Sequence, residues 1–470
     1  MRPRSILRRL VFVAINIAVL TLGSADFPST HLVFSSGMES PTLLFTVTKR
    51  YDGLAWMRGG DRFSADATVF LQDGSRRRPL VPGFAASADP AVSFEGTRVL
   101  FAGKRNAQDA WQIWEVELGG DTPQRVTSCV EDCVRPLFLP DDRVVYAKKT
   151  GGRFVVEVAD LADRKTVRPA LQLTYGPGNT LPSDVLRDGR ILFESSYPLG
   201  RDGVAELYTV YSDGSGVEAY RCDHGRTRHS GKQVGSGDIV FATSLRKSAA
   251  GLGRFTSARA QMEVISAPTG DYAGDVVETP AGDWLLPWRP DEKSYFQIKR
   301  WAPGAGNLVP MVADRAANVV QPTIVGERAT PKRHPSGLHD WPNANLLCLN
   351  AYTSQYRFGA GSIRSVRMYT RDDSGNAKLL GTAPVERDGS FFAQVPTEQP
   401  LQVELLDASG KTLKREAGWF WMRHGEQRAC VGCHSGPETS PENAVPMVLL
   451  KSTTPVDMTG NSGRAAAGGH

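Results

Sequence analysis

The chain has 470 residues, 41% hydrophobic and 22% charged, which is typical of a soluble globular protein, and its length predicts two or more domains. The formal net charge is +5, but residues 1–25 hold four arginines and no acidic residue, so the rest of the chain carries +1. This small charge gives no indication of a nucleic acid or an anionic membrane as partner.

Residues 1–25 predict a secretory signal peptide. Four arginines precede residue 10, the apolar run LVFVAINIAVLTLG follows, and small residues at 23–25 allow cleavage after Ala25. An uncleaved membrane anchor is the alternative, but the apolar run is short for a spanning helix. We therefore expect a periplasmic protein with no membrane span after cleavage.

Residues 40–325 contain a repeat with several short strands in each unit. Apolar segments end at Phe101, Tyr146, Phe193 and Phe241, at spacings of 45, 47 and 48 residues, and most follow a turn such as LPDD or LRDG. A period of this length is typical of a β-propeller, and LPDDRVVYA and LRDGRILFESS resemble TolB-like propeller repeats. A β-sandwich with coincidental spacing is the alternative. We predict six blades, at 40–85, 86–130, 131–177, 178–223, 224–272 and 273–325.

Two further segments follow the repeat. Residues 326–344 are rich in proline, histidine and basic residues without a period, which predicts a linker. Residues 345–422 alternate strand patterns with the turns RDDSGN, ERDG and DASG, which predicts a small β-sandwich. The predicted fold class is therefore all-β: a six-bladed β-propeller, then a small β-sandwich that carries a C-terminal haem segment.

The segment RACVGCHSGP at residues 428–437 carries the main chemical signal. Cys430, Cys433 and His434 form C-x-x-C-H, the attachment signature of c-type haem. Both thiols form thioether bonds to the porphyrin, and the adjacent histidine binds the iron as its proximal ligand. A redox disulfide or half of a zinc site are the alternatives. We predict one covalent haem c bound by residues 423–460, before a disordered tail at 461–470.

The ligand on the other side of the iron does not follow from the spacing. Met422 and His424, just upstream, are the candidates for this distal position, although a surface histidine is the other interpretation of His424. Met447 and Met458 lie among apolar neighbours and fit core packing. An iron with five ligands, or with water as the sixth, is also consistent with the sequence.

Three aromatic residues, Trp419, Phe420 and Trp421, precede the haem motif. In a strand, two of these side chains would point one way and the third the other. One face would then fill the sandwich core, and the other could cover a porphyrin edge.

The remaining cysteines suggest structural roles. Cys129 and Cys133 are expected to form a local disulfide, because exported thiols tend to oxidise, with metal binding as the alternative. Cys222 and Cys348 could pair, or each could be a buried thiol.

Two histidine-containing loops are weaker candidates for a site. Residues 221–231 include His224 and His229 at the start of a predicted blade, and a solvated loop is the alternative there. His334 and His339 lie in the predicted linker and could approach the haem.

The order of these segments resembles the hydrazine synthase alpha-subunit family, most specifically in DGSFFAQVP and GEQRACVGCH. The resemblance covers most of the chain after the signal peptide and implies that Cys430, Cys433 and His434 bind haem c. In that family a second haem motif follows, and a tyrosine shortly after the first motif ligates its iron. Neither follows His434 here, so we predict a single-haem relative in which His434 ligates the iron.

Three functions are consistent with this interpretation. The first is an exported monohaem cytochrome that transfers electrons to a redox partner protein, with the propeller as docking scaffold. The second is a haem-dependent redox enzyme with an open iron site, acting on a small nitrogen or oxygen species. The third is an interaction scaffold with a structural haem.

Overall fold

The computed structural model describes residues 41–161, 169–196, 205–221, 226–244, 250–258, 260–354, 356–372, 374–432 and 444–460. The predicted signal peptide and tail lie outside these residues, as do Cys222, His224, Cys433 and His434. Within them, regular structure is almost entirely strand, with one 3-10 turn, η1 (Trp56–Arg58), and one short helix, α1 (Met447–Lys451). No helix of this part of the chain is long and apolar enough to cross a membrane. The predicted all-β fold class is confirmed.

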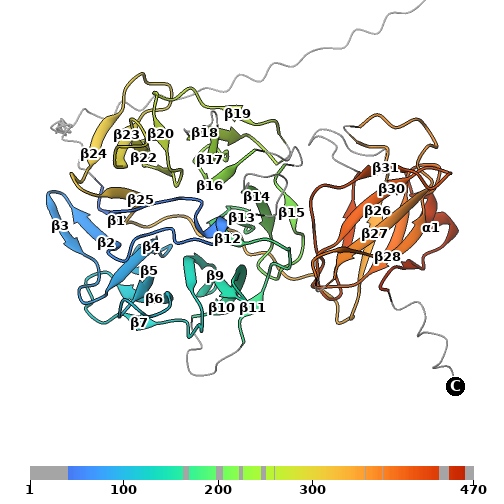
Figure 1. Cartoon of the computed structure of the whole chain (residues 1–470), viewed down its shortest axis with the longest axis horizontal. Helices are drawn as coiled ribbons and strands as arrows, with labels where there is room; N and C mark the ends of the chain where they lie inside the picture. Colours follow the sequence, from blue (N-terminus) through green and yellow to red (C-terminus); the bar gives the residue numbers. More distant parts are fainter. Residues whose placement is uncertain are drawn as a thin grey trace, which may run out of the picture. The chain divides into compact units, whose positions relative to one another are not determined.

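Between residues 43 and 324 the described strands form six sheets, numbered sheet 1 to sheet 6 below, which surround a common centre (Figure 1). Sheet 1 contains β25 (Asn318–Ile324), β1 (Leu43–Thr48), β2 (Thr68–Asp73) and β3 (Arg76–Pro79). Sheet 2 contains β4 (Ala86–Val92), β5 (Arg98–Lys104), β6 (Gln112–Glu117) and β7 (Gln124–Arg125). Sheet 3 contains β8 (Cys133–Leu139), β9 (Arg143–Thr150), β10 (Arg153–Asp160) and β11 (Leu171–Gln172).

The other three sheets follow the same order along the chain. Sheet 4 contains β12 (Thr180–Val185), β13 (Ile191–Ser195), β14 (Glu206–Val210) and β15 (Glu218–Ala219). Sheet 5 contains β16 (Arg228–Gln233), β17 (Ile239–Ser244), β18 (Ala250–Phe255) and β19 (Glu263–Val264). Sheet 6 contains β20 (Asp271–Tyr272), β21 (Val277–Glu278), β22 (Trp284–Arg289), β23 (Gln297–Trp301) and β24 (Val309–Val312).

The residues that revealed the period lie in the second strand of sheets 2 to 5, and Leu286 occupies the matching strand, β22, of sheet 6. Phe101, Tyr146, Phe193, Phe241 and Leu286 are all buried, and each packs in a different hydrophobic cluster. These strands are apolar on both faces because neighbouring sheets cover them on both sides. The apolar residues that recur in the sequence are therefore those that fill the hydrophobic cores between neighbouring sheets.

Strand β25 corrects the predicted assignment of residues 318–324 to the last repeat. It pairs with β1, antiparallel, with Val319 opposite Val47, and Thr46 Oγ1 donates a hydrogen bond to Gln321 Oε1 at 2.8 Å. This pairing joins the end of the repeat region to its start. The ring is closed because sheet 1 contains strands from both ends of the repeat region.

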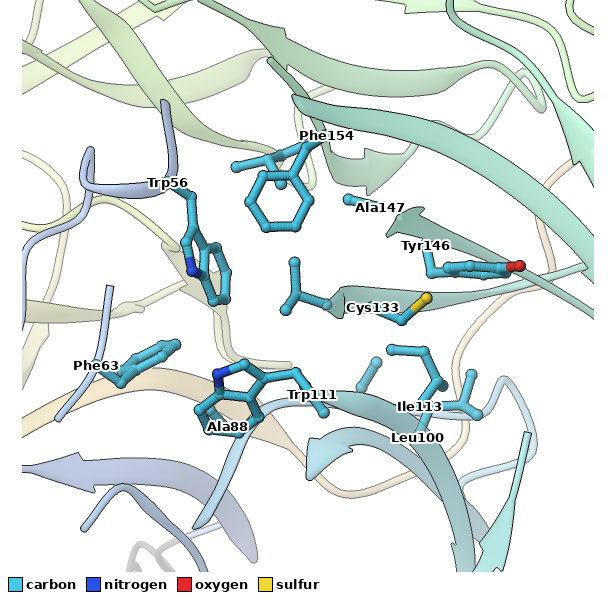
Figure 2. Packing of buried hydrophobic residues seen from close by; sticks show 14 of the residues in the cluster. Trp56, Phe63, Ala88, Leu100, Trp111, Ile113, Cys133, Tyr146, Ala147 and Phe154 are labelled. Atoms are coloured by element: carbon cyan, nitrogen blue, oxygen red, sulfur yellow. The ribbon is translucent and has the colours of Figure 1, made fainter. Parts of the chain in front are cut away.

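The loop between β1 and β2 fills the centre of the ring on one side. Trp56 packs against Phe154 of sheet 3, with ring centroids 6.0 Å apart, and Phe63 packs against Trp111 of sheet 2 at 6.4 Å (Figure 2). Tyr51 meets Phe296 of sheet 6 at 5.8 Å. We call residues 49–67 the plug loop.

Polar residues surround the centre beneath the plug loop. Asp89, Arg135, Ser230, Asp275 and Gln321 all have positive φ, and they lie in or beside the strands that line the centre. Several of these strands contain a β-bulge at this point. A bulge bends the strand and redirects its side chain, so the repeat places polar groups at the centre. The cavity lined by Asp89, Arg135, Asp275 and Gln321 measures only 40 Å³.

The residues between β25 and the next strand form no regular structure, but they lie against the propeller sheets. Arg328 N donates to Phe94 O at 2.8 Å, and Lys332 N donates to Arg187 O at 2.9 Å. The ring of His334 stacks on Tyr211 with centroids 3.6 Å apart. The predicted linker is therefore held along sheets 2 and 4.

The C-terminal strands form two further sheets. One contains β32 (Gln427–Cys430), β26 (Ala344–Cys348), β29 (Phe391–Val395) and β33 (Val456–Asp457). The other contains β28 (Ala377–Pro384), β27 (Ser365–Arg371), β30 (Gln402–Leu406) and β31 (Thr412–Arg415). Strands β32 and β33 come from the predicted haem segment, so this segment contributes to the sandwich as well as following it.

Candidate functional site

Cys430, the first cysteine of the haem motif, ends strand β32. This strand runs parallel to β26, and Leu349 N donates to Cys430 O at 2.8 Å. The start of the motif is thus held by a sheet. Cys433 and His434 lie outside the described residues, so the structure places only the first half of the motif.

A cavity of 430 Å³ lies beside Cys430. Its apolar wall comes from the sandwich and consists of Leu346, Phe391, Val403, Trp419 and Phe420. Cys430, Val431 and Gly432 form one edge of it. The size and lining are those of a site for a cofactor or a similar small molecule.

The opposite wall comes from sheet 4 of the propeller. Tyr208, Tyr211 and Val217 line it, together with the ion-paired side chains Arg190 and Glu218, 3.4 Å apart. The cavity therefore lies between two domains and outside the ring. No histidine or methionine is among its described lining residues.

Trp421 attaches the sandwich to the propeller. Its ring is 2% exposed and packs in the hydrophobic cluster between sheets 3 and 4, with Phe193 6.1 Å away between centroids. Its indole Nε1 donates a hydrogen bond to Leu173 O at 2.9 Å. Of the three consecutive aromatic residues, Trp419 and Phe420 line the cavity, and Trp421 fills a propeller core instead of the expected sandwich core. They form no regular strand here, so simple alternation does not apply.

Polar contacts next to Trp421 complete this attachment. The buried carboxylate of Glu426 accepts from Gly216 N at 3.1 Å and from Arg428 Nη2 at 2.6 Å. Arg428 Nη1 also donates to Val217 O at 3.3 Å. Arg423 donates to the Tyr175 hydroxyl at 2.5 Å. Charge-assisted bonds of this kind fix geometry well. They set the position of β32, and with it Cys430, relative to sheet 4.

Gly432 allows the motif to pack closely on the loop after β26. A Cβ at this position would lie 2.8 Å from Thr353 Cβ and 2.9 Å from Asn350 O. Such distances are shorter than van der Waals contact. Glycine at this motif position is therefore required by the fold.

The two candidates for the distal ligand lie away from the cavity wall. Met422 is fully buried in the sandwich core. His424 is exposed, its Nδ1 lies 3.0 Å from Pro342 O, and its Nε2 lies 3.4 Å from a Glu398 oxygen. Met458 is also buried in the sandwich core, as expected, and Met447 is half-buried in α1.

The predicted disulfide between Cys129 and Cys133 is confirmed, with Cα atoms 6.2 Å apart. Cys348 is buried on β26, where its register partner is Cys430. A pairing of Cys348 with Cys222 is not tested, because Cys222 lies outside the described residues. The sequence did not indicate that Cys348 belongs to the same site as the haem motif.

His229 lies at the centre of the propeller and not on a solvated loop. It is buried beneath the plug loop, and its Nδ1 lies 3.2 Å from Ser230 Oγ. Burial lowers the pKa of His229. Its neutral ring is thus a structural part of the central polar group. His334 lies behind one cavity wall through its stacking on Tyr211.

The fold and site define a class of protein in which a β-propeller is joined to a β-sandwich with a cavity at their junction. The solved hydrazine synthase from Kuenenia stuttgartiensis shares this fold, with a TM-score of 0.73 and 17% identity over 87% of this chain and 71% of that chain. TolB from Acinetobacter baumannii matches with a TM-score of 0.47 and 14% identity, over 62% of this chain and 67% of that one.

The sequence comparisons are more specific about the sandwich. Residues 351–435 match the family described as hydrazine synthase alpha subunit middle domain. Hydrazine synthase subunit alpha from Kuenenia stuttgartiensis is 28% identical over 93 residues, which make up 19% of this chain and 12% of that subunit. The predicted resemblance to the hydrazine synthase alpha-subunit family is confirmed.

Proposed function

We propose that this chain is an exported, single-haem c-type redox protein, whose haem is attached to Cys430 and Cys433 and ligated by His434. The observation that carries this proposal is the position of Cys430 at the edge of the 430 Å³ cavity. A cavity of this size, with aliphatic and aromatic walls, fits a porphyrin. The match of residues 351–435 to the hydrazine synthase alpha subunit middle domain, the family whose resemblance implied haem c at Cys430, Cys433 and His434, supports the same assignment.

The protein residues would position the haem and control its surroundings. When bound, haem iron supplies one-electron redox chemistry. Trp419, Phe420 and Leu346 would exclude water from the ring face, and exclusion of water is one of the factors that set the reduction potential. The ion-paired Arg190 and Glu218 provide polar groups on the propeller side. Sheet 4 would thus act as a wall of the haem site in addition to any docking role.

Electron transfer to a redox partner protein is the first function that we propose. It needs a covalently held haem in a fixed protein environment, and the sheet and the Trp421 attachment supply that environment. Export to the periplasm by residues 1–25 is part of this proposal, because covalent haem attachment belongs to that compartment.

A haem-dependent redox enzyme is the second candidate, and one observation favours it. The described cavity lining contains no histidine or methionine that would occupy a sixth iron position. An iron left open on this side would bind a small nitrogen or oxygen species. The name of the relative, hydrazine synthase subunit alpha, is consistent with such chemistry.

Two measurements on protein made in cells competent for cytochrome c maturation test these proposals. The mass of the denatured chain should show one retained haem, the C430A/C433A double variant should show none, and C222A should retain it. A haem-free wild-type chain would contradict the assignment. An optical spectrum then distinguishes the two proposed functions. Low-spin iron that does not bind cyanide supports electron transfer, and high-spin iron that binds cyanide supports the enzyme.

A further inference from the structure

Cys348 and Cys430 are direct neighbours on two parallel strands. The register of β26 and β32 pairs Leu346 with Arg428 and Cys348 with Cys430. Register partners in a sheet point to the same face. All four residues line the 430 Å³ cavity, which confirms that these side chains share that face.

The spacing of the two strands suits a disulfide. Neighbouring strands lie about 4.8 Å apart, and disulfides join Cα atoms about 4.4–6.8 Å apart. We propose that Cys348 and Cys430 form a disulfide in the haem-free chain, and that this bond is a redox control on haem loading. Cys348 would thereby be a further functional residue, although it lies 82 positions before Cys430 in the sequence.

The chemistry is a thiol–disulfide exchange with an external disulfide such as oxidised glutathione. Cys430 is half-buried and Cys348 is buried, so the Cys430 thiolate attacks the external disulfide first. One glutathione thiol leaves, and a mixed disulfide forms at Cys430. The Cys348 thiolate then attacks the Cys430 sulfur, and the second glutathione thiol leaves. The protein loses two protons and two electrons, and the glutathione disulfide gains them.

The consequence for haem loading rests on the proposed function, but the disulfide itself does not. A sulfur atom bound in a disulfide cannot add to a porphyrin vinyl group. Haem attachment at Cys430 would then need prior reduction of this bond. The bond also ties β32 to β26 while the cavity lacks its cofactor.

The test uses the full-length, haem-free chain, oxidised with glutathione disulfide, alkylated and digested without reduction. Mass spectrometry should find a peptide that joins Cys348 to Cys430, and reduction with dithiothreitol should release two alkylatable thiols. A Cys430–Cys433 peptide as the only product, or Cys430 alkylated without reduction, would overturn the proposal.

Two variants distinguish the possible disulfide partners of Cys430. C433S should keep the Cys348–Cys430 peptide, and C348S should lose it. The Cys129–Cys133 peptide serves as an internal control for folding in both variants. Failure of haem attachment to the reduced chain, in a protein whose oxidised form shows the Cys348–Cys430 peptide, would count against the proposed function alone. A C433S chain with an intact Cys129–Cys133 bond and an alkylated Cys430 would refute the disulfide alone.

Discussion

At position 421 the sandwich inserts an indole ring between sheets 3 and 4 of the propeller. The ring is 2% exposed, and its N–H is bonded to Leu173 O. Gly176 faces it so closely that a Cβ there would lie 3.1 Å from the indole. The attachment of the two domains thus depends on one large side chain in a fitted space.

Replacing Trp421 with alanine should therefore weaken the whole molecule. Deletion of a buried tryptophan typically costs about 3–5 kcal/mol of stability, and the Leu173 carbonyl would also lose its donor. Urea denaturation followed by circular dichroism measures the loss. Trp341, which is 50% exposed, is a matched control, and W341A should change stability by no more than about 0.5 kcal/mol. Equal effects of the two variants would contradict this role for Trp421.

Gly432 is the second residue whose size matters. A side chain there would meet Asn350 and Thr353, and overpacking of this kind costs about 1–3 kcal/mol. G432A should therefore lower the stability of the haem-free protein and reduce haem yield, measured by thermal unfolding and by haem absorbance. At Gly359 a Cβ would meet only Ser362, at 4.0 Å, so G359A is the control. A fully stable G432A variant would show that the loop after β26 adapts easily.

At the scale of an element, the plug loop places a buried arginine at the centre of the ring. Arg62 is 0% exposed, and its Nη2 lies 3.2 Å from Asp275 Oδ2 and 2.8 Å from the Tyr51 hydroxyl. Arg135 approaches the other Asp275 oxygen at 3.5 Å. The plug loop is therefore held by charge as well as by its aromatic residues.

This arrangement predicts a pH dependence of stability. Burial alone would raise the pKa of Asp275, but Arg135 and Arg62 outweigh it and hold the pKa below its usual value. A carboxyl group with a lowered pKa stabilises the fold above its unfolded pKa of about 3.9. This stabilisation is lost as the pH falls through the folded pKa.

The variant D275N should show this effect directly. Because it leaves two buried guanidinium groups with less compensation, it should cost about 3–5 kcal/mol at pH 7. The difference from wild type should shrink as the pH falls below about 4, where Asp275 takes up a proton in the unfolded parent, and it should be smallest below the folded pKa. Urea denaturation at both pH values measures this, with the exposed D121N as control. A difference that stays constant with pH would refute the electrostatic role.

At the scale of the whole molecule, closure of the ring depends on β1. This strand pairs with β2 on one side and β25 on the other, so it joins the two ends of the repeat region. Sheet 1 has no other link to β25 among its described strands. Loss of β1 would leave two open strand edges. It would also expose the hydrophobic residues that Leu43, Leu44 and Phe45 cover in the intact protein.

Two truncations test this closure. A chain that begins at Pro41 should unfold cooperatively like the full chain. A chain that begins at Lys49 should lose the cooperative transition and become sensitive to proteases. Calorimetry and limited proteolysis provide the measurements. Cooperative unfolding of the shorter chain at an unchanged temperature would show that the ring does not depend on β1.

The sequence alone was sufficient for features that depend on local patterns. Phe101, Tyr146, Phe193 and Phe241 reveal the period because each repeat must bury the same position against its neighbours. Cys129 and Cys133 predict their disulfide because exported thiols tend to oxidise and a turn brings cysteines four residues apart within bonding reach. The similarity of residues 351–435 to the hydrazine synthase alpha subunit is likewise visible in contiguous segments.

Only the tertiary structure could decide which distant segments meet. Residues 318–324 pair with β1, Trp421 enters a propeller core, and Cys348 lies beside Cys430. Strand β32 has four residues, too few to show a pattern, and its partner lies about 80 positions earlier. Pairing between strands and packing between domains depend on the surface that the rest of the chain presents, and no local pattern encodes that surface.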